Sequence, residues 1–235
     1  MARVWTILAV PPIVFLFIIV GASIYFGVRT DGDGQTIGNN VTRSTPYILL
    51  LVQIIVLFIL LSVLRSDNAS LRNIGWQAPA GGTLWREGAI GGVVGLILGV
   101  LYLSVLSPFL VAAQQRFGDY VPPGEMLPAL GAAVIPFFLA NVVFAPFVEE
   151  SIYRGYALSR LLPEFGIPGA VLISCIFFGL LHWAGGFWYI MLTGIVAGGV
   201  FSGLFVWRGS IIAPFAAHLT LNSIEFLYVW LKISR

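Results

Sequence analysis

Apolar runs long enough to cross a bilayer recur along the chain, and they restrict it to one class of fold. The first run extends from Trp5 to Val28, and later runs also approach or exceed the roughly 20 residues that a membrane helix needs. Hydrophobic residues make up 59% of the chain and charged residues 9%, whereas a soluble domain carries about 25% charged residues. Since backbone polar groups in lipid must be bonded internally, we expect an all-α, polytopic transmembrane helical bundle.

Turn-forming segments divide the chain into about seven helices, with six to eight as the expected range. The helices lie at about residues 5–28, 46–64, 88–112, 127–162, 168–184, 187–207 and 210–231. Residues 29–45 are expected to be a polar loop. The fourth helix is longer than a bilayer requires, so we expect it to be steeply tilted or broken at Pro146. The third has a glycine-rich face, which indicates close packing without chemistry.

The overall charge and the cysteine content exclude several classes of function. A net charge of +2 gives no reason to expect a nucleic-acid partner. The single cysteine, Cys175, forms no internal disulfide and no paired thiol site, and its apolar surroundings indicate core packing. The distribution of Lys and Arg slightly favours a cytoplasmic N-terminus.

Two adjacent acids and an arginine, Glu149, Glu150 and Arg154, interrupt the fourth apolar run. A charge at bilayer depth costs roughly 2.5–3.5 kcal/mol even on lenient scales, so such residues indicate a function. The alternative is a helix that has already left the membrane. Glu150 and Arg154 have the spacing and order of a favourable ion pair. Glu149 points about 100° away around the helix and is left free to act as a base, although the reverse assignment of the two acids stays open.

The only two histidines, His182 and His218, also lie in apolar helices. Each has a partner four residues away on the same helical face, Phe178 for His182 and Asn222 for His218. Glu225, seven residues after His218, lies on that face too, and we expect it to bond to a neighbouring helix rather than to line a site. Together with the acids, the two histidines predict one shared site.

Counting residues from the turns supports this convergence only in part. Glu149 lies 16 residues before Phe165, in the turn between the fourth and fifth helices, and His182 lies 17 residues after it. In an antiparallel hairpin the two side chains would therefore reach the same depth. His218 lies only nine residues after the turn at Gly209. Straight helices would then place the two histidines at different depths.

Two kinds of hydrolytic chemistry fit these side chains. In one, Glu149 and His182 activate a water that attacks a peptide carbonyl, while His218 and Asn222 donate hydrogen bonds to the oxyanion. In the other, His182, His218 and a carboxylate hold a divalent metal such as zinc, which polarises the water. The amide of Asn222 suits the first slightly better, because Asn is a poor zinc ligand.

Three motifs follow one another in separate hydrophobic helices, namely Glu149-Glu150-x-x-x-Arg154, Phe178-x-x-x-His182 and His218-x-x-x-Asn222. In this order they resemble the motifs of the CPBP family, intramembrane proteases related to the type II CAAX prenyl endopeptidases and to bacteriocin-processing or immunity proteins. The resemblance implies a protease whose site lies in a membrane cavity. It implies catalytic residues Glu149, His182, His218 and Asn222, and supporting residues Glu150, Arg154 and Phe178.

The resemblance covers about residues 125–231, so we divide the chain into an N-terminal three-span region (1–124) and a catalytic core (125–235), joined in one membrane domain. It leaves the metal open, and a metallo-version would use Glu149, His182 and His218 as ligands. The compact connection between the motifs resembles prokaryotic members and argues against prenylated substrates. We therefore expect an endopeptidase of a prokaryotic cell membrane, with a membrane-associated peptide or protein as substrate.

Two further readings stay open. One is an immunity or scaffold protein of the same fold that binds a peptide without cutting it. The other is a small transporter or proton relay, since these also use intramembrane Glu and His. Against it, no inverted repeat is visible and the acids cluster at one level.

Overall fold

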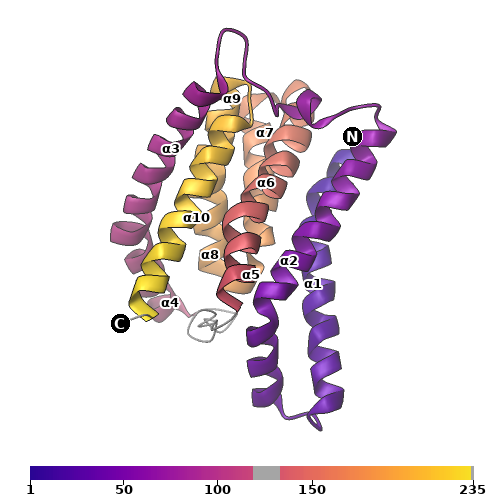
Figure 1. Ribbon diagram of the computed structural model, residues 1–235, viewed down its shortest axis with the longest axis vertical. Coiled ribbons are helices and arrows are strands. Elements are labelled where there is room, and N and C mark those ends of the chain that lie inside the picture. The colour runs from indigo at the N-terminus through magenta and orange to yellow at the C-terminus, as the bar shows by residue number, and fades with distance from the viewer. Residues whose placement is uncertain (119–132, 234–235) are drawn as a thin grey trace.

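The computed structural model describes residues 1–118 and 133–233, and within these ranges the chain is helical apart from short turns, with no strand. The helices form a bundle in which α1 and α2 lie on one side and α3 and α10 on the other, as Figure 1 shows. The expected all-α bundle is confirmed.

The helices of the first half are α1 (Ala2–Arg29), α2 (Gly34–Ser66), the 3-10 helix η1 (Leu71–Ile74), α3 (Leu84–Leu101), the π-helix η2 (Tyr102–Leu106) and α4 (Ser107–Phe117). Those of the second half are α5 (Val134–Phe138), the π-helix η4 (Leu139–Phe144), α6 (Ala145–Glu149), the π-helix η5 (Glu150–Leu158), α7 (Ser159–Leu181), the 3-10 helix η6 (Trp183–Gly185), α8 (Phe187–Leu192), the π-helix η7 (Thr193–Ala197), α9 (Gly198–Arg208) and α10 (Ile212–Ile233).

Adjoining elements merge into longer rods that are suited to a membrane. Five segments are long and apolar enough to cross one, namely Ala2–Arg29, Gly34–Ser66, Leu84–Phe117, Val134–Leu181 and Phe187–Arg208. The fourth of these is two helices, because Gly166 has a φ of 64° and turns the chain back on itself. Tyr153 and Phe178, on its two arms, lie with their ring centroids 5.4 Å apart. With α10 added, the described residues form seven helical rods, the expected number.

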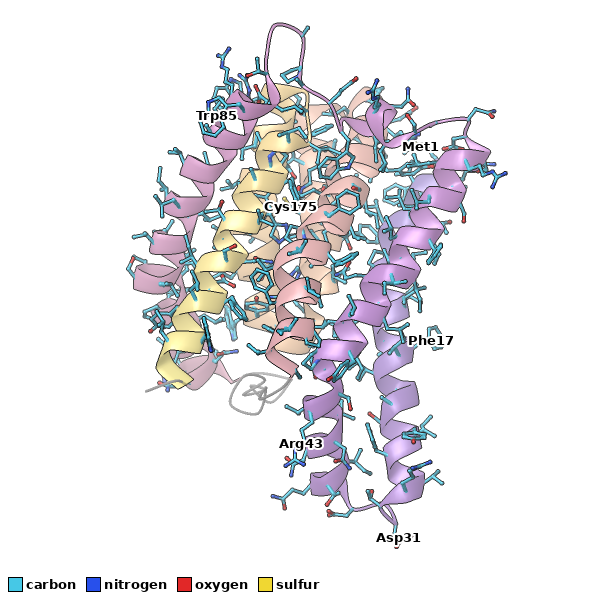
Figure 2. All side chains as sticks on the ribbon, in the orientation of Figure 1. Met1, Phe17, Asp31, Arg43, Trp85 and Cys175 are labelled. Atoms are coloured by element: carbon cyan, nitrogen blue, oxygen red, sulfur yellow. The ribbon has the colours of Figure 1, made fainter. Side chains whose placement is uncertain are left out.

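The second helix begins earlier than the sequence suggested. Asp33 caps it, because its side chain accepts a hydrogen bond from the Thr36 N–H at 2.9 Å. The expected loop over residues 29–45 was therefore wrong, since the turn occupies only residues 30–33. The polar start of α2 lengthens a hairpin that extends beyond the other helices, with Asp31 at its tip in Figure 2.

The fourth helix is not broken at Pro146. Helical backbone continues from Val134 through this proline, and the first departure from helical geometry comes at Gly166. The π-helix η4 ends just before Pro146, and its wider turn relieves the clash that a proline ring makes in a regular α-helix. The expected start near Leu127 lies outside the described residues.

The charged segment is the centre of the bundle. Every residue from Val148 to Leu158 is buried, and η5 is in contact with α1, α7, α9 and η1. We call the rod from α5 to the first turns of α7 the central helix. Its charges are enclosed by protein, which argues against the alternative that this part of the helix has left the membrane and carries solvated charges. Cys175 is also buried, as expected, whereas Phe17 is 72% exposed and points outward from α1 in Figure 2.

The glycine-rich helix packs closely against α10. A Cβ on Gly91 would lie 2.7 Å from the Ala216 Cβ, and one on Gly95 would lie 2.7 Å from the Thr220 Cβ. Gly92, on another face of the same helix, has nothing within 4 Å of such a Cβ. The small residues therefore let the two backbones approach, as the sequence predicted, and they fix the position of α10.

Candidate active site

An ion pair inside the central helix anchors the site. Arg154 Nη1 donates to Glu150 Oε1 at 3.0 Å, and both side chains are fully buried. This is the pair that the four-residue spacing predicted. Arg154 Nη2 also donates to the carbonyl of Gly198 at 3.1 Å, and the guanidinium carbon lies 4.3 Å from the centre of the Phe178 ring. Arg154 thus joins the central helix to α7 and α9 and holds Glu150 in place.

Glu150 also binds His218 of α10. The His218 Nδ1 lies 2.9 Å from the same oxygen that Arg154 contacts. An oxygen that already accepts from Arg154 takes a further hydrogen bond as acceptor, so Nδ1 carries the proton and Nε2 remains for other partners. The imidazole stacks on Phe201 with ring centroids 4.7 Å apart. The position and orientation of His218 therefore depend on the ion pair.

The residue count placed His218 at a different depth from His182, and this was wrong. The count assumed that the turn at Phe165 and the turn at Gly209 lie at the same height in the bundle, and they do not. The backbone N–H of Ile211 donates to the carbonyl of Gly75 at 3.0 Å, and Ile211 packs so closely on Gly155 that a Cβ there would collide with it. The connection into α10 therefore meets the central helix only five residues from Glu150. His218, seven residues after Ile211, reaches that level.

Glu149 has a different environment from Glu150. Its Oε1 accepts a hydrogen bond from Gln53 Nε2 of α2 at 3.2 Å. Its Oε2 is buried and has no hydrogen-bond partner among the described residues. Each of the two acids keeps one carboxylate oxygen, Oε2, without a described partner, but their other oxygens bind different helices, α2 for Glu149 and α10 for Glu150.

His182 ends α7 with its ring held in one orientation. Its Nδ1 lies 2.8 Å from the carbonyl oxygen of Phe178. A carbonyl oxygen only accepts, so Nδ1 carries the proton and Nε2 has a free lone pair. The Phe178 ring packs against both imidazoles, with centroids 5.0 Å from His182 and 5.8 Å from His218. His182 is therefore prepared to accept a proton at Nε2.

Asn222 lies one turn after His218 and keeps part of its hydrogen-bonding capacity. Its Nδ2 donates to the backbone carbonyl of Asn141 in η4 at 2.8 Å. An amide nitrogen has two N–H groups, so one remains available. The bond to η4 fixes the Asn222 side chain relative to the central helix.

These side chains surround one cavity of about 100 Å³. All four residues predicted as catalytic line this cavity, namely Glu149, His182, His218 and Asn222. The ring of Phe178, predicted as a supporting residue, lines it too. They come from α6, from the end of α7 and from α10. The residue count that placed Glu149 and His182 at one depth agrees with this arrangement, and the structure brings the three motifs together inside the bundle.

A larger cavity of about 460 Å³ adjoins the first. Seven residues line both cavities, and we call them the junction: Tyr102, Asn141, Ala145, Glu149, His182, Tyr189 and Glu225. The larger cavity is walled mainly by apolar side chains of α1, α2, α5 and α10, including Phe15, Leu49, Phe137 and Phe226. The candidate catalytic groups therefore stand where a small polar chamber meets a wider apolar one.

Three residues of the site differ from the sequence expectations or were missed by them. Gln53 and Asn141 were not singled out, although each is the only amide side chain in its apolar run, 46–64 and 133–148. Glu225 was expected to bond to a neighbouring helix, and this was wrong. It lines both cavities, and no described residue donates a hydrogen bond or forms an ion pair with it.

The metal-binding alternative gains no support from the described part of the chain. Within it, no three His, Cys, Asp or Glu side chains lie close enough together to hold a metal ion. The Nδ1 atoms of His182 and His218 are both engaged, so each could offer only Nε2. Metal dependence therefore stays a prediction.

The comparison with protein families assigns the second half of the chain. Residues 131–224 match the family described as Type II CAAX prenyl endopeptidase Rce1-like. This part of the chain is related to the CAAX proteases. The matched segment contains all three motifs and leaves α1 to α4 outside it. No curated protein and no solved structure matches the chain. The family relation and the apolar helices together identify an integral membrane protein related to membrane endopeptidases.

Proposed function

We propose that the protein is an intramembrane endopeptidase that hydrolyses a peptide bond of a membrane-associated protein or peptide. A water between Glu149 and His182 attacks the peptide carbonyl carbon, and Glu149 accepts the water proton. His218 and Asn222 donate hydrogen bonds to the carbonyl oxygen as it becomes negative. Glu149 then donates this proton to the leaving nitrogen as the carbon–nitrogen bond breaks, which releases an amine and a carboxylic acid and restores the Glu149 carboxylate.

One observation carries the proposal. The partnerless Oε2 of Glu149 and the imidazole of His182, with its free Nε2, belong to side chains that line the same cavity. A cavity of about 100 Å³ has room for a few water molecules. An unpaired carboxylate inside a bundle is costly, so keeping one beside a water-sized cavity is consistent with use as a base. Glu150 also has one oxygen, Oε2, without a partner in the described part of the chain, but it does not line the cavity, and Arg154 and His218 both contact its other oxygen.

The oxyanion role places a specific requirement on His218. Its Nδ1 already donates to Glu150, so Nε2 donates to an oxyanion only when the ring carries both protons. The remaining N–H of Asn222 supplies a second donor. Removing one donor of this kind typically lowers kcat by about 100- to 1,000-fold, so His218→Ala and Asn222→Ala should each reduce turnover by that order.

Cleavage of a peptide library by the purified protein in detergent tests the proposal. Glu149→Gln and His182→Ala should each lower kcat by about 100-fold or more, because general base catalysis contributes at least that much. Glu164→Gln is the matched control, since Glu164 is exposed at the turn between the first two motifs, ten residues after Arg154 and fourteen before Phe178. Wild-type turnover in Glu149→Gln would refute the assignment. A wild type that cleaves no peptide would refute the activity and leave the binding-protein alternative.

The same assay distinguishes the two hydrolytic chemistries. Under the carboxylate mechanism, prolonged treatment with a chelator leaves the wild-type rate unchanged. Loss of activity that added zinc restores would instead establish metal dependence, for which Glu149, His182 and His218 are the candidate ligands.

A further inference from the structure

Glu225 places a second carboxylate at the junction, in addition to the proposed base. It lies on α10 seven residues after His218, which is about two turns and about 10 Å along the helix. It is partly buried and lines both cavities. None of the described residues donates a hydrogen bond to its carboxylate or pairs with it. The three motifs do not include it, and the proposed hydrolysis gives it no part.

The charge around the two cavities is unbalanced. Glu149 and Glu225 are the two acids among the lining residues, and no described Lys or Arg lines either cavity. Arg154, inside the same bundle, is engaged by Glu150. A carboxylate in an apolar enclosure is costly unless a cation or several hydrogen-bond donors compensate it. The walls of the two cavities therefore contain two acids and no described cation that compensates them. A bound molecule with a positive group would supply that charge.

We infer that Glu225 forms a subsite for a basic side chain, Lys or Arg, of the substrate. The inference rests on the proposed function and specifies its substrate class. Tyr102 of η2 and Tyr189 of α8 line the same junction. Each adds an aromatic ring and a hydroxyl group to the walls of the subsite. The apolar stem of Lys or Arg suits the walls of the larger cavity, while the charged end reaches the carboxylate.

The geometry also indicates where the basic residue lies in the substrate. About 10 Å separates the level of Glu225 from that of His218. An extended peptide rises about 3.3 Å per residue, so the basic residue stands about three positions from the scissile bond. Lys and Arg are enriched next to membrane-spanning segments. The subsite therefore fits a membrane substrate that is cut near the end of its apolar segment.

Matched peptides test the inference. One series carries lysine at each of the positions two to four residues from the scissile bond, on either side of it. The second series carries norleucine there, which keeps most of the stem and removes the charge. Wild type should favour the best lysine peptide in kcat/KM by about tenfold or more, as a hydrogen bond to a charged group provides. Glu225→Gln should reduce this ratio to near one, and Glu164→Gln should retain it.

A second variant and a binding measurement separate this inference from the proposed function. Glu225→Lys should favour a peptide with glutamate at the same position. Binding of the fluorescent lysine and norleucine peptides to Glu149→Gln should show the same preference without any cleavage. An equal response to both peptides in wild type, or an unchanged ratio in Glu225→Gln, would overturn the inference. If no peptide is cleaved but lysine is still preferred in binding, the proposed function fails and the subsite stands.

Discussion

Replacing Gly95 with alanine should push α10 away from α3. The added Cβ would lie 2.7 Å from the Thr220 Cβ and 2.9 Å from the Ala217 Cα, whereas relaxed carbon atoms keep about 3.5–4.0 Å. The contacts at Ala217 include backbone, so no side-chain rotation relieves them. The helices must separate by about 1 Å, which moves His218, the next residue after Ala217.

The expected change in stability is the balance of two terms. Overpacking of a close contact costs about 1–3 kcal/mol, while replacing glycine by alanine inside a helix gains about 0.5–1 kcal/mol. Gly95→Ala should therefore destabilise the protein by roughly 0–2.5 kcal/mol. For a chain of this length each kcal/mol lowers the unfolding midpoint by about 2–4 °C, so we expect a decrease of up to about 10 °C.

Thermal unfolding in detergent, followed by tryptophan fluorescence, measures this difference. Gly92→Ala is the matched control, because it makes the same change on the same helix with nothing within 4 Å of the new Cβ. It should be neutral or slightly stabilising. Gly95→Ala should also lose up to about 100-fold in cleavage, since a 1 Å displacement of a catalytic group has effects of that size. Equal midpoints for the two variants would refute the close contact between α3 and α10.

Three further perturbations follow from single contacts. Arg154→Met leaves Glu150 without its counter-charge and should cost about 3–5 kcal/mol of stability, measured as a lower unfolding midpoint. Gln53→Leu removes the donor to Glu149 and should lower kcat by about tenfold, the order that a charge-assisted hydrogen bond provides. Burial acts to raise the pKa of Asp67, in the turn after α2, but hydrogen bonds from Tyr156 and Arg3 and the charges nearby outweigh it, so the pKa lies below its usual value of 3.8. The folded state therefore favours the ionised carboxylate, and this adds stability at pH values above 3.8. As the pH falls below 3.8 and Asp67 is protonated, the stability advantage of wild type over Asp67→Asn should shrink.

The first two perturbations have matched controls. Arg72→Met removes an exposed arginine and should leave the midpoint unchanged. Gln35→Leu makes the same change as Gln53→Leu at an exposed position of α2 and should leave kcat unchanged. Full activity in Gln53→Leu would show that α2 does not position the base, and a pH-independent difference for Asp67→Asn would show that its ionisation does not couple to folding.

Much of the candidate site could be predicted because its residue types are rare in membrane helices. Apolar spans seldom contain Glu or His, and helical spacing alone paired Glu150 with Arg154. Counting from the turn at Phe165 placed Glu149 and His182 at one depth, and both line the small cavity. For these two residues the convergence followed from helical geometry, whereas the same count failed for His218.

The remaining features depend on local backbone details that apolar patterns do not encode. The cap at Asp33 starts α2 early, a π turn absorbs Pro146, and Gly166 makes the turn that the proline does not. Helical spacing placed Glu225 on the face of His218, but whether a neighbouring helix offers it a donor depends on the packing of the whole bundle.

The shared acceptor Glu150 has a consequence for how the protein is made. Its partner His218 lies in the last helix, and Glu149 beside it is held by Gln53 of the second. Ribosomes deliver helices in order from the N-terminus, so every shorter nascent form lacks part of the constellation. The proposed peptidase can therefore gain activity only once α10 has docked beside α3, with His218 against Glu150.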